Sequence, residues 1–158
     1  MDDFDNNDLS IKVEKAYAKA LKFLSYRPRS QKEIEDFLAK KKFDKDIIVI
    51  LIERLKELKF VNDEEFAKWW IEQRQRYRAR SKRIIKQELR FKGISEELIE
   101  KLLDEGESDF ATALAIFNKR KNKLRNLTPD EFKKKTIEYL QRRGFSWDII
   151  KEVIKLTK

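Results

Sequence analysis

The sequence contains no cysteine and no histidine among its 158 residues. Without cysteine there is no disulfide framework, no thiolate nucleophile and no cysteine-based zinc or iron–sulfur site. Without histidine the Ser-His-Asp triad is excluded, and so are most catalytic metal sites. Any catalysis would have to depend on carboxylate, lysine, arginine, tyrosine or serine side chains alone.

Glycine and proline are also scarce. The chain has three glycines and two prolines, whereas average composition would give about 19 of the two together. Gly93, Gly106 and Gly144 are isolated, so neither a GxGxxG turn nor a phosphate-binding loop can form. A composition of 42% charged and 41% hydrophobic residues suits exposed helices that each have one buried face. We therefore predict an all-α fold.

No segment has the pattern of a membrane anchor or a targeting signal. The longest apolar run, residues 47–52, has six residues, whereas a spanning helix needs about 20. Residues 1–9 are acidic, unlike a signal or transit peptide, and we expect them to be disordered. These features predict a cytoplasmic protein with no membrane partner.

Helix caps and apolar spacing predict nine helices. The first covers residues 12–25 and ends before Pro28, because the residue that precedes a proline is pushed out of the right-handed helical region. Most of the others begin with a side chain that can cap a helix, in three cases with a glutamate three residues later that completes a capping box. The predicted N-cap residues are Ser30, Asp44, Asn62, Ser95, Ser108, Thr128 and Ser146. Gly93 and Gly144 supply the left-handed residue that ends the fifth and the eighth helix.

Three segments of the chain align without gaps. Residues 38–51, 89–102 and 140–153 share their apolar positions, and the offset is 51 residues in both steps. Self-similarity at a fixed period is typical of repeat architectures, in which each unit stacks on the next and enlarges the core. We predict three tandem three-helix repeats that form an elongated, curved solenoid; the alternative is one compact bundle with coincidental similarity. The predicted repeats are residues 10–61, 62–106 and 107–158.

Positive charge is concentrated in one stretch. Residues 74–92 hold nine basic residues and one acid, a local charge of +8 in a chain whose formal net charge is +9. A solvated helix face ordinarily mixes charges of both signs. In a stretch of nearly one sign the charges repel one another, and a bound polyanion would reduce that repulsion. We predict that this stretch binds nucleic acid, free or within a protein filament; a merely solubilising face is the alternative. The candidate contacts are Arg74, Arg76, Arg78, Arg80, Lys82, Arg83, Lys86 and Arg90.

A second basic patch lies in the third predicted repeat. Its residues are Lys119, Arg120, Lys121, Lys123 and Arg125. In the first cluster, Tyr77 and Phe91 lie among the charges and could be stacking faces for bases, although core or edge positions are the alternative. The acidic groups at residues 63–65 and 96–97 lie in first helical turns, so we interpret them as favouring the helix macrodipole rather than as acid–base pairs.

Five short motifs occur in a fixed order between residues 15 and 155. They are RSQKEI at 29–34, LKFVNDEEFA at 58–67, Arg83-Ile84 followed by Leu89, KGI at 92–94 and RGFS at 143–146. Each alone is a helix cap with apolar spacing. The five in order, together with the threefold repeat, resemble the RecX regulatory proteins of bacteria.

This resemblance implies a crescent of three three-helix repeats that binds the RecA recombinase, especially its filament on single-stranded DNA. Family members modulate RecA, mostly by inhibiting strand exchange, ATP hydrolysis and co-protease activity, and some bind DNA themselves. The resemblance also implies a non-enzymatic protein with no cofactor and no metal, which we expect to act as a monomer in DNA repair, recombination and the SOS response. The alternative is a general DNA- or RNA-binding helical repeat protein without a recombinase partner.

The sequence departs from the family at three positions where relatives often have glycine. This chain has Lys42, Lys59 and Arg80 there. A side chain makes the left-handed backbone conformation costly, by about 1 kcal/mol if that conformation is kept. We therefore expect the turns of the first repeat to differ from those of relatives.

Overall fold

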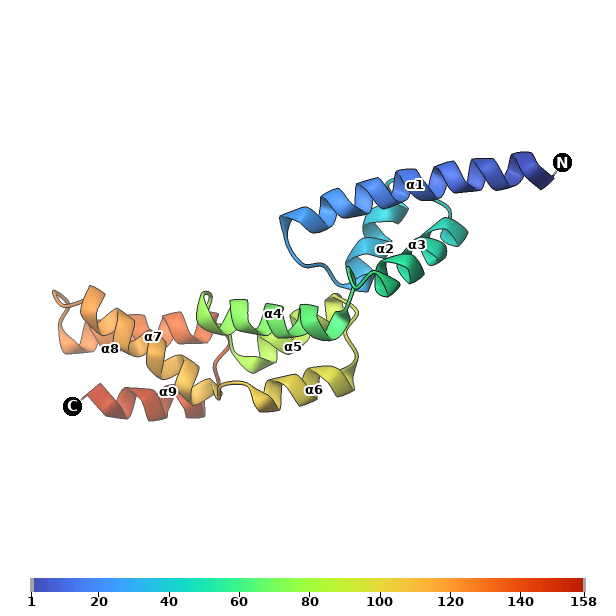
Figure 1. Cartoon of the computed structure of the whole chain (residues 1–158). Helices are drawn as coiled ribbons and strands as arrows, with labels where there is room; N and C mark the ends of the chain where they lie inside the picture. The colour runs from blue at the N-terminus through green and yellow to red at the C-terminus, as the bar shows by residue number, and fades with distance from the viewer. Residues whose placement is uncertain (1, 158) are drawn as a thin grey trace. The chain divides into compact units, whose positions relative to one another are not determined.

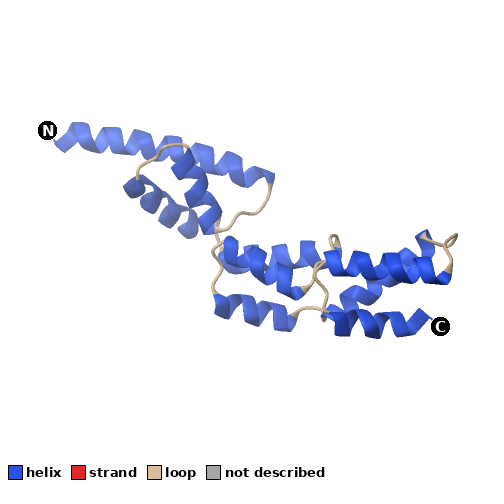
Figure 2. Ribbon diagram, turned by 180° about the vertical axis from the view of Figure 1, so that it is seen from behind, coloured by secondary structure: helices blue, strands red, loops and turns tan. Residues whose placement is uncertain are grey.

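The computed structural model describes residues 2–157, and every regular element in this range is helical. Nine α-helices follow one another, and a 3₁₀ helix, Lys155–Thr157, follows the last of them (Figure 1). The α-helices are α1 (Asp2–Tyr26), α2 (Gln31–Lys40), α3 (Lys45–Glu57), α4 (Asp63–Arg76), α5 (Lys82–Phe91), α6 (Glu96–Glu105), α7 (Asp109–Lys123), α8 (Pro129–Arg142) and α9 (Trp147–Ile154). Between residues 2 and 157 there is no strand, as the colouring of Figure 2 shows. The all-α prediction is therefore confirmed.

The first helix begins earlier than the sequence indicated. α1 starts at Asp2, so residues 2–9, which we expected to be disordered, are helical. An ion pair contributes to the difference, because Lys12 Nζ lies 2.7 Å from Oδ2 of Asp8, one helical turn away. Pairs of opposite charge at this spacing favour the helical conformation. Residue 1 of the expected disordered segment lies outside the described residues.

Internal contacts group the helices into two compact units. One comprises Met1–Trp69 with Phe91–Ser95, and the other comprises Trp70–Arg90 with Glu96–Lys158. The boundary passes through the second predicted repeat, so the compact units are not the repeats themselves. The repeat boundaries at 10–61, 62–106 and 107–158 and the curved solenoid stay predictions.

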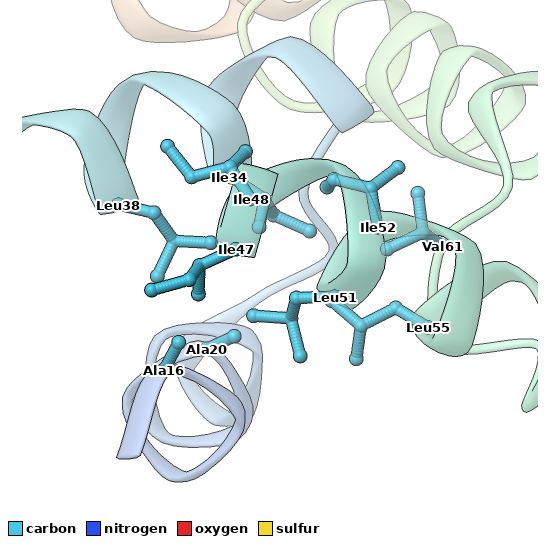
Figure 3. Packing of buried hydrophobic residues seen from close by; sticks show 10 residues of the cluster. All are labelled: Ala16, Ala20, Ile34, Leu38, Ile47, Ile48, Leu51, Ile52, Leu55 and Val61. Atoms are coloured by element: carbon cyan, nitrogen blue, oxygen red, sulfur yellow. The ribbon is translucent and has the colours of Figure 1, made fainter. Parts of the chain in front are cut away.

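The core of the first unit is built from the apolar faces of α1, α2 and α3 (Figure 3). Ala16 and Ala20 lie one turn apart on α1 and are fully buried, and their small side chains allow α3 to pack closely against them. Leu51 and Leu55 on α3 and Leu38 on α2 are fully buried as well. Burying one leucine side chain contributes about 1.5–3 kcal/mol. The three helices are therefore held together by side chains at the helical spacing that the sequence showed.

α7, α8 and α9 form a hydrophobic core within the second unit. Ala113, Leu140 and Val153, one from each helix, are fully buried. Phe117 packs edge-to-face on Phe132 with 5.6 Å between the ring centroids. Aromatic pairs in this arrangement contribute about 0.5–1.5 kcal/mol beyond the area that they bury. This packing sets the position of the outer, basic face of α7.

A lysine occupies the left-handed position that ends α2. Lys42 has a φ of 69°, its N–H donates to the carbonyl oxygen of Ala39 at 3.0 Å, and the N–H of Phe43 donates to that of Leu38 at 3.2 Å. These two bonds define a Schellman motif. Gly144 ends α8 in the same way with a φ of 89°. The two turns therefore share their geometry although the left-handed residue differs.

The end of α3 follows the same pattern, and the end of α4 does not. Lys59 has a φ of 62° and closes a second Schellman motif. After α4 the left-handed residue is Ala79, with a φ of 47°, and the N–H of Arg80 donates to the carbonyl oxygen of Arg74 at 3.0 Å across a wider turn. Both first-repeat turns therefore have the left-handed residue and the paired backbone hydrogen bonds seen at Gly144, although the residue is a lysine. The expected difference from the turns of relatives stays a prediction.

Two predicted capping boxes are confirmed. The hydroxyl of Ser30 accepts a hydrogen bond from the N–H of Glu33 at 3.2 Å, and the hydroxyl of Thr128 accepts one from Glu131 at the same distance. Each glutamate accepts a hydrogen bond from the N–H of its cap residue in return. Asp44 precedes α3 in an extended conformation but makes no side-chain cap hydrogen bond.

The N-terminus of α2 contacts segments that lie much later in the chain. The N–H of Gln31 donates to Oδ1 of Asp63, the first residue of α4, at 2.9 Å. The carboxylate of Glu33 pairs with Arg27 at 2.7 Å and also accepts a hydrogen bond from Nζ of Lys92. We call this arrangement, in which a second helix of one repeat binds the start of the next repeat, a repeat joint.

A second repeat joint lies 51 residues later, at the N-terminus of α5. The N–H of Lys82 donates to Oδ1 of Asp109, the first residue of α7, at 2.9 Å. Arg143, at the position equivalent to Lys92, donates to the carbonyl oxygen of Arg78. The sequence periodicity thus extends to the contacts between successive repeats.

Glycine is required where each repeat joint is tightest. Gly93 and Gly144 have φ values of 79° and 89°. A Cβ at Gly93 would lie 2.8 Å from Cβ of Lys32, and a Cβ at Gly144 would lie 2.6 Å from Oγ of Ser81. Both glycines are therefore needed for close approach as well as for ending a helix.

Candidate nucleic-acid interface

The predicted basic cluster extends over the end of α4, the following turn and α5, and several of its members are engaged in structural contacts. Arg74 Nε lies 2.9 Å from Glu88 Oε2, and its guanidinium carbon is 4.4 Å from the centroid of the Trp70 ring. The indole N–H of Trp70 donates to the same carboxylate at 2.8 Å. Arg74 therefore stabilises the packing of α4 on α5, and its charge is already compensated.

Lys86 and Arg90 on α5 are paired with carboxylates of α6. Lys86 Nζ lies 3.4 Å from Glu96 and 3.5 Å from Glu100, and Arg90 also pairs with Glu96. The hydrogen bond from Arg90 lowers the pKa of Glu96 below its usual value. The charges of these two residues are thus compensated by acids of the next helix, and both fit the solubilising alternative better than nucleic-acid contact.

The other predicted contacts differ in accessibility. Arg76 is exposed, with a pairing distance of 3.4 Å to Glu72 one turn earlier. Arg78 and Arg83 are exposed, and neither has a carboxylate within ion-pair distance among the described residues. Lys82 is half-buried at the repeat joint. Arg80 turns inwards, where its Nε is buried without a partner among the described residues and its Nη1 lies 3.5 Å from the carbonyl oxygen of Arg142.

A pocket of about 260 Å³ brings the two basic clusters together. Arg76 and Arg78 line it from the end of α4 and the following turn, and a row of cations on α7 lines it as well. That row consists of Lys119, Arg120 and Lys123. No carboxylate belongs to the described residues that line the pocket. Lys121 and Arg125 of the second patch do not line it.

Tyr139 of α8 lines this pocket and stacks with two arginines, of which Arg120 also lines the pocket. The guanidinium carbon of Arg120 lies 4.2 Å from the Tyr139 ring centroid, and that of Arg143 lies 4.8 Å from it. Stacking on one ring holds two like charges close together through cation–π attraction. The sequence does not distinguish Tyr139, because its spacing on α8 is also that of an ordinary amphipathic helix.

The aromatic residues within the basic stretch are at the surface. Tyr77 is 67% exposed and Phe91 is 82% exposed, so neither ring belongs to the core. Tyr77 lines the pocket next to Arg76, whose guanidinium carbon is 5.7 Å from its ring centroid. An exposed ring beside exposed cations is the combination that single-stranded nucleic acids bind through stacking and charge.

Comparison with known proteins identifies the family. Residues 16–55, 62–103 and 107–154 match the first, second and third three-helix domains of RecX, respectively. The chain belongs to the RecX family. The prediction of three three-helix repeats from the 51-residue offset is thereby confirmed, and most of the chain lies within the three matched RecX domains.

Individual RecX proteins resemble the chain over most of its length. It is 35% identical to the regulatory protein RecX of Bacillus subtilis (strain 168) over 95% of this chain and 58% of the relative. It is 34% identical to the regulatory protein RecX of Bacillus pumilus (strain SAFR-032) over 90% of this chain and 55% of the relative. The chain thus spans little more than half the length of these relatives.

Solved RecX structures share the fold. The crystal structure of RecX from Lactobacillus salivarius superposes with a TM-score of 0.74 at 27% identity, covering 94% of this chain and 97% of that one. A second crystal structure of a regulatory protein RecX gives a TM-score of 0.71 at 23% identity, covering 90% and 72% of the two chains. Within the described residues, none of the helices is both long and apolar enough to cross a membrane.

Proposed function

We propose that the chain is a non-enzymatic regulator that binds the RecA recombinase filament on single-stranded DNA and inhibits its recombination, ATPase and co-protease activities. The observation that carries this proposal is the match of all three RecX domains in order along the chain. The relatives at 34–35% identity are named regulatory proteins, which agrees with a sequence without cysteine and histidine. The proposed site of action is the cytoplasm, where the protein acts as a monomer.

The charge distribution supports a surface that faces nucleoprotein. The pocket between the end of α4 and α7 concentrates five cations without a lining carboxylate. A phosphate backbone would neutralise them and release counterions, which makes binding favourable and salt-dependent. Among the predicted contacts, Arg76, Arg78 and Arg83 are exposed, and we propose that they contribute most to filament binding.

The test measures DNA-dependent ATP hydrolysis by the host RecA together with co-sedimentation of its filament. Added protein should inhibit hydrolysis and sediment with the filament in moderate salt. A triple variant, Arg76→Glu, Arg78→Glu and Arg83→Glu, should lose both effects while its far-UV circular dichroism is unchanged. Arg80 is left intact because it is partly buried, so its reversal would disturb folding.

A matched control separates local from global charge effects. The variant Lys15→Glu, Lys19→Glu and Lys22→Glu changes the net charge equally at positions of α1. It should keep inhibition and co-sedimentation. If the wild-type protein neither inhibits nor sediments with the filament, or if the Arg76 triple variant retains both effects, the proposal is wrong.

The second candidate function is general nucleic-acid binding without a recombinase partner. The cation pocket favours it as well, since charge does not distinguish bare DNA from a filament. If five phosphates are contacted, the logarithm of the binding constant for a single strand should fall with the logarithm of salt concentration at a slope of about −3.5, from about −0.7 per phosphate. Such binding without any effect on RecA would favour this second function.

A further inference from the structure

The cations of the α4–α7 pocket are not neutralised within the protein. Arg78, Lys119, Arg120 and Lys123 have no ion-pair partner among the described residues, and Arg76 alone has an exposed carboxylate near it. Nε of Arg120 is in addition buried without a hydrogen-bond partner among the described residues. Like charges held together without counterions repel one another, and bound anions relieve that repulsion. The pocket therefore has the electrostatics of an anion site.

The walls of the pocket are held in place before any ligand binds. Arg120 and Arg143 stack on the ring of Tyr139, and Arg143 donates to the carbonyl oxygen of Arg78. The adjoining turn is completed by Ala79 in its left-handed conformation. A site whose donors are already ordered loses less conformational entropy on binding than one on a mobile loop.

The size and charge of the pocket favour a polymer over a small anion. Its volume of about 260 Å³ is below the 300–1,000 Å³ or so that is typical of sites for drug-sized ligands, so one phosphate with its sugar is a suitable occupant. Five cations exceed the charge of a single phosphate ester. Because Arg76, Arg78 and three cations of α7 line one pocket, successive phosphates of one strand can satisfy them together.

The first repeat offers an internal comparison. Tyr26 is equivalent to Tyr77 at the 51-residue offset and is 73% exposed. Its neighbouring arginines, however, are used within the protein: Arg27 pairs with Glu33, and the Arg29 guanidinium carbon lies 3.8 Å from the centroid of the Phe23 ring. Of the two tyrosines, Tyr77 is therefore the one that adjoins cations lining a pocket.

From this geometry we propose that the α4–α7 pocket binds a phosphodiester of single-stranded nucleic acid, with an adjacent base stacked on Tyr77. This pocket assignment rests on the proposed function, because both place nucleic acid against this surface. The binding concerns the isolated protein, however, and does not require a recombinase. Tyr77 distinguishes the ligand from an acidic peptide, because every base offers a face for stacking and a carboxylate does not.

The experiment measures binding of a fluorescently labelled deoxythymidine oligomer to the full chain by anisotropy. Tyr77→Ala should weaken binding about 5- to 150-fold, from about 1–3 kcal/mol for stacking of one base, whereas Tyr26→Ala should leave it unchanged. A double variant, Lys119→Ala and Lys123→Ala, should make the salt slope shallower by about 0.7 for each phosphate that is no longer neutralised. The control for that pair is Lys15→Ala with Lys19→Ala, which should not change the slope.

Competition identifies the ligand. Unlabelled oligomer should displace the labelled strand at far lower concentration than thymidine monophosphate or polyglutamate does. Equal effects of Tyr77→Ala and Tyr26→Ala, an unchanged salt slope in the Lys119 and Lys123 variant, or equally effective displacement by either competitor would each overturn the pocket assignment.

The RecA ATPase assay separates this proposal from the proposed function. Pocket-dependent strand binding without inhibition of RecA would support the pocket and contradict the recombinase assignment. Inhibition of RecA with strand binding that does not depend on Tyr77 or the α7 lysines would contradict the pocket alone.

Discussion

The backbone N–H of Gln31 and the Asp63 carboxylate, 32 residues apart in sequence, form a hydrogen bond of 2.9 Å. It satisfies a donor that the first turn of every helix otherwise leaves without an intrahelical partner. The bond of the same length between Lys82 and Asp109 does so for α5. In both repeat joints, therefore, the first residue of one helix accepts a hydrogen bond from the first backbone N–H of another.

Removal of the Asp63 carboxylate should destabilise the protein. We expect Asp63→Ala to lower the free energy of unfolding by about 1 kcal/mol, within the range of about 0.5–2 kcal/mol that removal of an N-cap costs. Urea denaturation followed by circular dichroism measures it. Glu65→Ala, which removes an exposed acid from the same turn of α4, is the control and should change stability little. Equal effects of the two substitutions would show that the bond to Gln31 contributes nothing specific.

Glu33 should make the first repeat joint sensitive to acid. Burial alone would raise the pKa of Glu33, but hydrogen bonds from Arg27, Lys92 and the N–H of Ser30 outweigh it, and the pKa is lowered. Since the folded-state pKa lies below the unfolded one, the stabilisation is complete above the unfolded pKa of about 4.3 and is lost as pH falls through the folded value. The stability difference between wild type and Glu33→Gln should therefore be largest near neutral pH and vanish in strong acid. A difference independent of pH would contradict the role of the charge.

Glycine at either left-handed lysine should stabilise the protein. Lys42→Gly and Lys59→Gly each relieve a side chain at positive φ, and we expect a gain of up to about 1 kcal/mol from each, partly offset by the greater freedom of glycine in the unfolded chain. Thermal denaturation measures this gain. Lys41→Gly is the matched control, because Lys41 has a φ of −80° and glycine there should destabilise. Loss of stability in all three variants would contradict the expectation.

A methyl group at Gly144 should be more harmful than one at Gly93. In Gly144→Ala the new Cβ would collide with Ile84 and with Oγ of Ser81, so overpacking of about 1–3 kcal/mol adds to the cost of the positive φ. In Gly93→Ala the neighbour is the side chain of Lys32, which extends to the surface and can move in part. Gly106→Ala has no positive φ and should be tolerated. Urea midpoints in the order Gly106→Ala, Gly93→Ala, Gly144→Ala from highest to lowest would agree with this structure, and the reverse order would contradict it.

Solution scattering tests the predicted solenoid. A compact globule of 158 residues has a radius of gyration of about 15 Å, and a row of three stacked repeats should clearly exceed that value. A measured radius close to the compact figure would contradict the solenoid.

Local signals in the sequence predict most of the helix starts and ends. Ser30 with Glu33 and Thr128 with Glu131 are encoded within four residues, and the structure forms both capping boxes. Sequence alone relates the acid at Asp63 only to its own helix, because its hydrogen-bond partner is 32 residues away. The spacing of residues within one helix cannot indicate a contact with a residue of another helix.

The sequence predicted which basic residues could form the candidate site, but not how they are arranged in space. Net charge identified both basic clusters, but whether a cation is free depends on acids from a neighbouring helix, as with Arg74 and Glu88 or Arg90 and Glu96. The pocket depends on the packing of α7 beside the turn that follows α4, which brings Arg78 and Lys119 together from positions 41 residues apart. The sequence indicated charge, and tertiary packing decides which charges remain available.

The two repeat joints have a consequence for cooperativity. Each joint connects only neighbouring repeats, so the stability of such a chain is approximately a sum of repeat terms and interface terms, as in a one-dimensional Ising model. Breaking the joint at Gln31 and Asp63 leaves the one at Lys82 and Asp109 intact. A substitution that breaks one joint would therefore divide a single unfolding transition into two successive ones. The repeats on the far side of the broken joint would keep their own denaturation midpoint.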